Sequence, residues 1–533
     1  MTPGSPATAL RRATRRSLAL GAGLALGAWT PAGTAADTPV ELGRRLFREG
    51  RAASGEPITA VVSGDVPLSG AQVSCQGCHG RSGMGAGEGE IRVPPVSGLL
   101  FEPSPQRRRA AYDATSLARA LREGVDPSGR ALAALMPRYR IGDAEVEALE
   151  AYLRGLSATP SPGVTETTIR FATVVSDALP EDERSAVLDV LARFFDERNR
   201  QTRLESRRPG HGAPPGRPRP TTYRAWALDV WQLSGPGDTW PAQLEARYRA
   251  QPVFALLGGA SGGSWAPIAG FCERHEVPCI LPGTDLPAGE EGDFYSLHFS
   301  RGLLLEADLI AADLAQAAVR RVVQLFPAGA PVRLAAERLA SGLRQRGAAS
   351  EAWPLEGDPD AWRLTRRLRE AAPAAIVLWL PRGSLDRVGA LPTGVRVYVS
   401  STLLERRLEG LSVGGSPLLA AHGYALPGAP DPALQRFRAW RSSRGIAARH
   451  ERRQVQAYFA CLAAKEGLMH ADRFFVRDYF LDSLDHAQAL PAYLPLYPRA
   501  STGPGQRFLA KGGYLLPLRN GRPLTRQARW LVP

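Results

Sequence analysis

The chain has 533 residues and a formal net charge of +14, with 66 lysines and arginines against 52 aspartates and glutamates. This length predicts more than one domain. The basic residues are spread along the chain rather than gathered in one arm or helix, so the charge does not indicate a nucleic-acid-binding protein. No P-loop, H-E-x-x-H sequence or Ser/His/Asp grouping appears, which argues against nucleotide-dependent, zinc and serine enzymes.

Residues 1–36 are typical of a secretory signal peptide. Arginines at 11–16 precede a short apolar stretch at 17–29, and Thr34-Ala35-Ala36 offers small residues for cleavage. The apolar stretch is too short to span a bilayer, and no other segment is predicted to be transmembrane. We expect export to the periplasm, with cleavage near Ala36. Residues 14–18 resemble a twin-arginine signal, so both the general and the twin-arginine export routes stay open.

Residues 75–79 read Cys-Gln-Gly-Cys-His, the C-x-x-C-H sequence at which a c-type haem is attached. The two thiols, Cys75 and Cys78, add to the two vinyl groups of one porphyrin, and His79 then ligates the iron. A zinc site would need more ligands nearby, and the next cysteine is Cys272. The glycines that follow the motif argue against a thioredoxin-like pair. The sequence therefore predicts one covalently attached haem c.

The surrounding residues, 37–157, are predicted to form one domain with helices at 40–51, 115–123 and 141–156. Two methionines are candidates for the sixth iron ligand. Met84 is too close to His79 in sequence to reach the opposite haem face easily. We therefore predict Met136 as the ligand; the alternative is a methionine that fills a gap in the core.

The predicted iron ligand must also be held in one orientation. We expect His79 to donate its other ring N–H to a backbone carbonyl, and the sequence does not choose between those of Pro94 and Pro95.

With these features, residues 40–157 resemble a class I cytochrome c. The resemblance rests on C-x-x-C-H and on these further residues: Met136-Pro137, and Gly43, Phe47 and Tyr152 in the predicted first and last helices. It implies an all-α domain in which the first helix crosses the last one, with Gly43 against Tyr152.

Residues 158–168 contain Pro160, Pro162 and Gly163 and are predicted to be a linker. The second domain, 169–533, alternates apolar runs with amphipathic helices. Strands are predicted at 169–175, 223–232, 253–257, 278–281, 321–325, 375–380 and 395–399. Helices are predicted at 183–199, 241–249, 267–275, 303–317, 331–346 and 362–371. Repeated βα units indicate an α/β architecture with parallel sheets, and the length favours two lobes.

The second domain resembles the type I periplasmic solute-binding proteins of ABC transporters, of the branched-chain amino acid class. The resemblance is carried by residues 253–261, 268–282 and 295–306. It implies a small-molecule ligand in a cleft between two lobes, and an ABC permease as a partner. A narrower resemblance, to a subgroup found with quinoprotein alcohol dehydrogenase systems, rests on residues 238–240, 271–272, 278–279 and 503–507.

Several polar residues are candidates for that cleft. Ser261, Gly262 and Ser264 directly follow a predicted strand, where backbone N–H groups and hydroxyls are able to bind a carboxylate. The alternative is an ordinary tight turn. Thr284 and Tyr295 are weaker candidates. No acidic residue can be assigned to a ligand amine, so the ligand class stays open.

The remaining cysteines lie in the second domain. Cys272 and Cys279 have six residues between them, and a disulfide is expected in an oxidising compartment; the alternative is two buried thiols. Cys461 is expected to be a buried free thiol.

The sequence thus predicts a periplasmic electron carrier fused to a solute-binding module. Its haem would pass electrons between a dehydrogenase, a quinoprotein by the narrower resemblance, and the respiratory chain or a terminal oxidase. The alternative is an ABC transport receptor whose haem is sensory or regulatory. An enzyme is not expected, because no catalytic acid–base grouping or second cofactor motif is visible.

Overall fold

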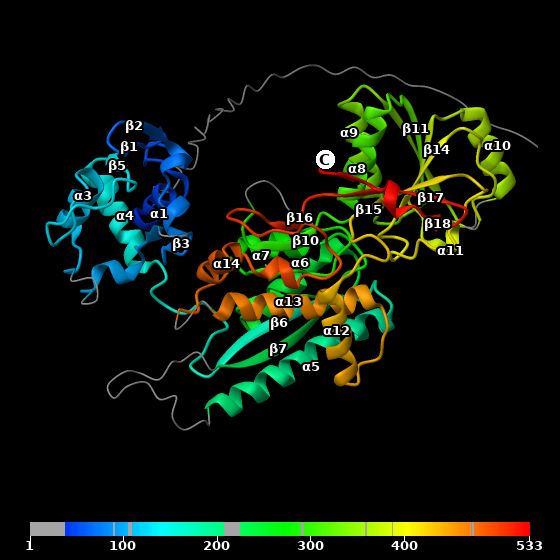
Figure 1. Ribbon diagram of the computed structural model, residues 1–533. Coiled ribbons are helices and arrows are strands. Elements are labelled where there is room, and N and C mark those ends of the chain that lie inside the picture. Colours follow the sequence, from blue (N-terminus) through cyan, green and yellow to red (C-terminus); the bar gives the residue numbers. More distant parts are fainter. Residues whose placement is uncertain are drawn as a thin grey trace, which may run out of the picture.

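The computed structural model describes residues 38–88, 91–104, 109–206, 224–288, 293–357, 360–385, 387–469, 471 and 474–533. The predicted signal peptide, 1–36, lies outside these residues. An N-terminal domain is followed by two α/β units. Figure 1 shows the first α/β unit lying between the N-terminal domain, in blue and cyan, and the second α/β unit.

The N-terminal domain has the three helices that the sequence predicts. They are α1 (Pro39–Glu49), α3 (Ala114–Arg122) and α4 (Asp143–Gly155). Helices α1 and α4 cross at Gly43, where a Cβ would lie only 2.0 Å from the carbonyl oxygen of Ala148. The rings of Phe47 and Tyr152 pack beside this crossing with centroids 5.5 Å apart. This geometry confirms the expected contact between the first and last helices.

The domain is not all-α, which corrects the expectation. An antiparallel sheet has the order β2 (Val66–Ser69), β1 (Thr59–Val62), β5 (Arg138–Arg140), and a second antiparallel pair joins β3 (Ala86–Glu88) to β4 (Ile91–Val93). The segment 59–69 is rich in β-branched residues and turns at Gly64, whose φ is +96°. These are features of a hairpin that the helical periodicity of the neighbouring segments did not indicate.

The first α/β unit contains a parallel sheet in the order β16-β10-β9-β8-β6-β7. Its strands are β6 (Thr168–Ser176), β7 (Ala225–Leu233), β8 (Ala255–Leu257), β9 (Cys279–Ile280), β10 (Ser296–Ser300) and β16 (Phe508–Ala510). Its helices are α5 (Glu181–Ser206), α6 (Trp240–Ala250), α7 (Ala266–Arg274), α12 (Pro432–Ser443), α13 (Glu451–Met469) and α14 (Arg477–Asp485). Apolar clusters on both faces of this sheet form its core.

The second α/β unit contains a mixed sheet in the order β12-β11-β13-β14-β15-β17-β18, with β19 paired to β17. The parallel strands are β11 (Arg321–Pro327), β12 (Ala349–Leu355), β13 (Ala375–Leu378), β14 (Arg396–Ser400) and β15 (Leu418–His422). The antiparallel strands are β17 (Gly513–Arg519), β18 (Arg522–Pro523) and β19 (Arg529–Leu531). Its helices are α8 (Leu303–Gln316), α9 (Arg333–Arg344), α10 (Ala361–Ala371) and α11 (Arg382–Leu385). The antiparallel edge was not predicted, because the last predicted strand ends at residue 399.

The two α/β units have separate apolar cores. The chain passes between them after β10, after β15 and after β16, so each unit is assembled from distant parts of the sequence. Among the described residues, no helix is both long enough and apolar enough to cross a membrane.

Candidate functional site

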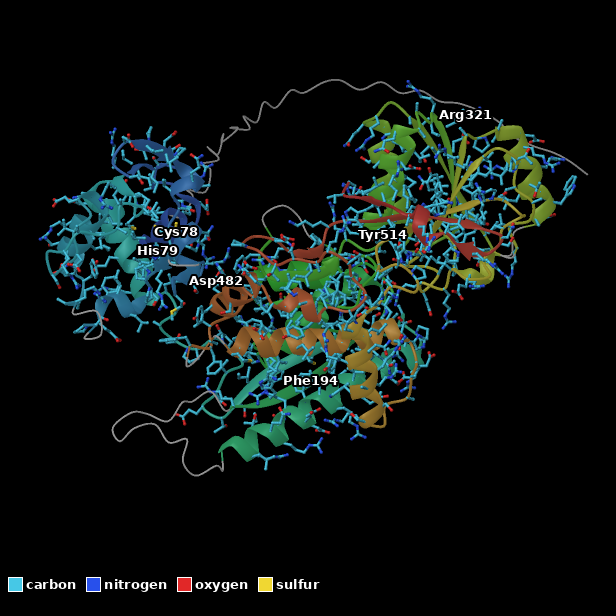
Figure 2. The ribbon with its side chains drawn as sticks, viewed as in Figure 1. Cys78, His79, Phe194, Arg321, Asp482 and Tyr514 are labelled. Carbon is cyan, nitrogen blue, oxygen red and sulfur yellow. The ribbon has the colours of Figure 1, made fainter. Side chains whose placement is uncertain are left out.

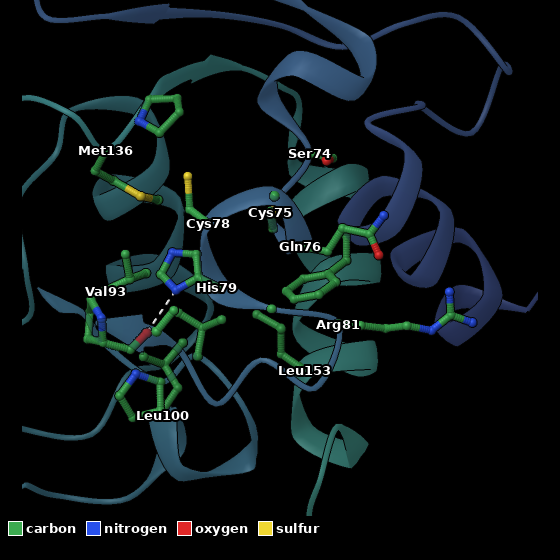
Figure 3. A pocket seen from close by; sticks show the side chains of 18 of the residues that line it. Ser74, Cys75, Gln76, Cys78, His79, Arg81, Val93, Leu100, Met136 and Leu153 are labelled. Atoms are coloured by element: carbon green, nitrogen blue, oxygen red, sulfur yellow. Dashed lines mark hydrogen bonds between the residues drawn. The ribbon is translucent and has the colours of Figure 1, made fainter. Parts of the chain in front are cut away.

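A cavity of about 1200 Å³ lies in the N-terminal domain, and Cys75, Cys78, His79 and Met136 all border it. The motif forms the short helix α2 (Gln76–His79), which places its two thiols and its imidazole around one space. Figure 3 shows the Met136 thioether pointing toward the same space as Cys78 and His79. Apolar side chains, among them Phe47, Leu100 and Leu153, supply the walls.

The imidazole of His79 is held in one orientation. Its Nδ1 lies 2.8 Å from the carbonyl oxygen of Pro94, so Nδ1–H donates and Nε2 is left as the ligating nitrogen (Figure 3). The structure thereby selects Pro94, where the sequence left Pro94 and Pro95 open. Burial lowers the pKa of His79, which favours the neutral imidazole that binds metals.

Of the two candidate methionines, only Met136 borders the cavity; Met84 is not among its lining residues. The neighbouring strand β5 is tied to the segment before the motif, because the hydroxyl of Tyr139 donates to the carbonyl of Val73 at 2.8 Å. Two thiols, an oriented imidazole, a thioether and apolar walls therefore converge on one space. This donor set fits a covalently attached haem.

The predicted cleft residues of the second domain do not form one group. Ser261 donates to the carbonyl of Gly263 at 3.1 Å, and the amide of Gly262 donates to Ser176 Oγ at 3.1 Å. The hydroxyl of Ser264 accepts from the amide of Ala266 at 3.2 Å. These polar groups therefore make hydrogen bonds within the turn at 261–266 and to Ser176 at the end of β6.

Thr284 and Tyr295 lie at opposite ends of neighbouring strands. Thr284 follows β9 and lines a small cavity together with Asp285 and Arg452. Tyr295 precedes β10, and its hydroxyl donates to the Asp478 carboxylate at 2.6 Å, on the side of the N-terminal domain. The structure does not bring these two residues together.

A second cavity, of about 400 Å³, lies between the two α/β units. Its lining is strongly charged, with four arginines and three glutamates: Glu183, Glu405, Arg406, Arg407, Glu451, Arg452 and Arg453. Burial alone would raise the pKa of Asp285, but the neighbouring Arg452 and Arg453 lower it to about 2. That carboxylate and Glu183 neutralise both arginines.

Arg406 differs from these paired arginines. Its Nε is buried and has no hydrogen-bond partner among the described residues, and burial lowers its pKa. Its guanidinium lies 5.6 Å from the ring centroid of Tyr424, and its backbone has a φ of +65°. Sequence reasoning missed this residue, because an arginine in a polar loop carries no pattern that distinguishes it from a solvated one.

The expected disulfide between Cys272 and Cys279 is not present. Both residues are fully buried free thiols in the core of the first α/β unit. The sulfur of Cys279 accepts from the indole N–H of Trp265 at 3.4 Å, so it has a polar partner as a thiol. Cys461 is also a buried free thiol, as expected.

Comparison with known proteins places the first site in a family. The family model "Cytochrome c" matches residues 70–157. No curated protein matches the chain by sequence.

Solved structures that resemble the rest of the chain are substrate-binding proteins of ABC transporters. One from Desulfitobacterium hafniense, in complex with Leu, is 14% identical and covers 68% of this chain and 100% of its own, with a TM-score of 0.45. A branched-chain amino acid transporter protein from Thermus thermophilus, with bound valine, is 11% identical and covers 68% and 96%, with a TM-score of 0.46. One from Rhodopseudomonas palustris BisB5, in complex with 3,4-dihydroxybenzoic acid, is 15% identical and covers 67% and 95%, with a TM-score of 0.43.

Residues 70–157 thus match the cytochrome c family model, and the chain joins this domain to an α/β region that is similar in fold to solute-binding proteins of ABC transporters.

Proposed function

We propose that the protein is a periplasmic electron carrier that holds one haem c and recognises a small solute with its α/β region. The observation that carries the first part is the convergence of Cys75, Cys78 and an oriented His79 on one apolar cavity. Two thiols and one imidazole at this spacing are the attachment set of a haem c, so the proposed role is electron transfer.

Each side chain has a distinct part in this function. Cys75 and Cys78 would hold the porphyrin through their sulfur atoms, and His79 would bind the iron while the Pro94 carbonyl fixes its ring. Met136, which lines the same cavity, would be the second protein ligand of the iron, and a thioether ligand raises the reduction potential. Apolar walls limit the access of water to the site. When bound, the haem supplies reversible one-electron transfer.

The test is an absorption spectrum of the oxidised and reduced protein after periplasmic expression. Wild type is expected to show a low-spin haem c with a methionine-to-iron band, and Met136→Ala is expected to lose that band. Met84→Ala is the matched control and is expected to keep it. A band that survives in Met136→Ala would remove Met136 as ligand, and absence of covalent haem would overturn the electron-transfer proposal.

For the α/β region, we propose that the two units are lobes and that a small solute with a carboxylate binds between them. The cavity between the units supports this, because Arg406 lines it and the buried Nε of Arg406 has no hydrogen-bond partner among the described residues. Burying such a cation is unfavourable unless an anion pairs with it. Thr284, and the turn at Ser261, Gly262 and Ser264, lie at the same carboxyl ends of the strands and remain proposed contacts.

This second proposal is tested by calorimetric titration of a panel of small mono- and dicarboxylates. Arg406→Gln is expected to weaken binding about tenfold or more, since a charge-assisted hydrogen bond contributes roughly 1.5–3 kcal/mol. The control is Arg366→Gln, which removes an exposed arginine of the second unit that pairs with Glu370. Equal affinities of wild type and Arg406→Gln would contradict the proposed contact.

Two kinds of partner follow from the two sites. We propose a periplasmic dehydrogenase, a quinoprotein by the narrower resemblance, or a terminal oxidase as the redox partner. The alternative partner is an ABC permease, with this protein as a transport receptor that has a sensory haem. The observation that would support this alternative is the cavity between the units. A solute that binds without changing the reduction potential would indicate that the haem domain and the α/β region function separately. A bound solute shifts the potential only if it has different affinities for the oxidised and reduced protein.

A further inference from the structure

The haem cavity is not enclosed by the cytochrome domain alone. Part of its lining comes from the first α/β unit, more than a hundred residues further along the chain: Phe294, Asp482, Asp485, His486, Pro504 and Gly505. Figure 2 shows Asp482 at the boundary between the domain that carries Cys78 and His79 and the α/β region. One edge of the haem pocket is therefore a joint surface of two domains.

Asp482, on α14, binds the turn that immediately follows the iron ligand. Its Oδ2 accepts from the amide of Ser82 at 2.9 Å, and its Oδ1 accepts from the amide of Arg81 at 3.2 Å. Gly80 makes this approach possible, because its φ is +74° and a Cβ there would lie 2.7 Å from Asp482 Oδ2. The carboxylate thus holds two backbone groups within three residues of His79.

An ionic cluster fixes the same interface on a second side. Arg48 of α1 donates to Asp478 at 3.2 Å and to Glu276 at 3.1 Å, although only 8% of the Arg48 residue is exposed. The Arg81 guanidinium lies 4.3 Å from the ring centroid of Phe294 and 3.7 Å from the Asp478 carboxylate. Buried charge pairs with several hydrogen bonds are geometrically specific, so they hold the two domains in one register.

The linker and the core of the first unit hold α14 in place. The amide of Arg477 donates to Ser161 Oγ at 3.0 Å, and the amide of Ser161 donates to the carbonyl of Phe475 at 3.0 Å. The Arg477 guanidinium donates to the carbonyls of Val253 and Phe254 at 2.6 and 2.9 Å, just before β8. Asp482 is therefore presented to the haem turn by a helix that is anchored at its first residue.

We propose that the first α/β unit completes the haem pocket, with Asp482 as a positioning residue that holds the turn after His79 and lowers the reduction potential of the haem. This inference rests on the proposed haem binding. Asp485 at the same edge is paired with Arg507 at 2.7 Å, whereas the described hydrogen-bond partners of the Asp482 carboxylate are neutral: the amides of Arg81 and Ser82 and the Ser82 hydroxyl. An unneutralised carboxylate close to the site stabilises the more positive, oxidised iron.

Two consequences follow for electron transfer. The edge of the pocket that α14 covers is closed to an external redox partner, so that partner must dock on another face of the cytochrome domain. The potential also becomes a property of the whole chain, because a carboxylate of the α/β region contributes to it.

The experiment compares the midpoint potentials of full-length, haem-loaded wild type and Asp482→Asn at pH 8. Burial raises the pKa of Asp482 to about 6, so the wild-type carboxylate is charged at this pH. The variant keeps the shape of the side chain and loses its charge, and its potential is expected to rise. Asp431→Asn is the control, since Asp431 also accepts two backbone amides, of Leu434 and Leu496, but does not line the cavity. Its potential is expected to equal that of wild type.

A haem-loaded Asp482→Asn with the wild-type potential would overturn the inference, whereas a chain without covalent haem would overturn the proposed function instead. A second measurement needs no variant. In wild type, hydrogen exchange at the amides of Arg81 and Ser82 is expected to be as slow as exchange in α14. Rapid exchange at these two amides would show that Asp482 does not hold the turn, and would also overturn the inference.

Discussion

At the residue scale, the stability of the protein depends on two positions, one that requires a small side chain and one that requires an uncharged side chain. Gly43 lets α1 and α4 approach so closely that their backbones are nearly in contact. In the second α/β unit, Glu306 is fully buried, accepts from the amide of Thr402 at 3.0 Å and contacts the hydroxyl of Ser400. Both positions lead to predictions about stability.

Gly43→Ala is expected to destabilise the cytochrome domain. The new Cβ would lie 2.0 Å from a carbonyl oxygen of α4, so the helices must separate, at a cost of about 1–3 kcal/mol or more. The control is Gly155→Ala in α4, where no atom lies within 4 Å of the added Cβ. That change is expected to stabilise the helix by about 0.5–1 kcal/mol. Denaturant unfolding followed at the haem absorbance measures both; equal effects would contradict the close crossing.

Glu306→Gln is expected to stabilise the protein as the pH rises. Burial raises the pKa of Glu306 from 4.5 to about 8, so the folded chain holds a proton that the unfolded chain releases above pH 4.5. The free energy of unfolding of wild type therefore falls between pH 4.5 and 8, by about 1.4 kcal/mol per pH unit. The neutral glutamine does not cause this loss. The difference in the free energy of unfolding between variant and wild type should therefore increase from pH 4.5 to 8.

Unfolding curves at several pH values measure this gap. Glu370→Gln, which changes an exposed glutamate of α10, is the control and should give a difference that is flat with pH. A flat difference for Glu306→Gln as well would show that Glu306 is ionised in the folded chain.

At the element scale, short polar and apolar patterns predicted most helices and most of the parallel strands. The three helices of the cytochrome domain and the strands from β6 to β14, with the exceptions of β10 and β12, lie where the sequence placed them. The pattern could not decide, however, whether Cys272 in α7 and Cys279 in β9 form a disulfide or stay as two thiols. Sequence separation permits a disulfide, but the structure has both cysteines as free thiols that lie together in one buried apolar cluster.

The thiol state is open to direct counting. Of the 5 cysteines, the two of the motif are consumed by haem, so the denatured holoprotein is expected to react with three equivalents of a thiol reagent without prior reduction. The folded protein should react slowly, because Cys272, Cys279 and Cys461 are 0% exposed. One equivalent instead of three would indicate a disulfide between Cys272 and Cys279.

At the scale of the whole molecule, the cytochrome domain and the second α/β unit lie on opposite sides of the first α/β unit (Figure 1). The cytochrome domain contacts residues just before β9 and β10, Glu276 and Tyr295, at the amino ends of parallel strands. The charged cavity lies where the chain crosses to the second unit, at the carboxyl ends. A solute in that cavity is therefore separated from the haem by a layer of packed sheet and helices.

This arrangement predicts that a bound solute does not reduce the haem directly. A carboxylate that binds in the calorimetric panel, added in excess to the oxidised protein, is expected to leave the absorption spectrum of the haem oxidised. A small-molecule reductant serves as the positive control. Reduction by the bound solute alone would contradict the separation of the sites and favour an enzyme.

The sequence by itself determined the chemistry that is contiguous along the chain. Five adjacent residues carry the haem motif, and local periodicity carries the helices and the βα repeats, because both depend on neighbours within a few positions. Tertiary structure decided which carbonyl holds His79, that the Nε of Arg406 is buried with no partner among the described residues, and what closes the haem pocket. Asp482 and Ser82 are 400 residues apart, and no local pattern records a contact that exists only after the chain has folded back on itself.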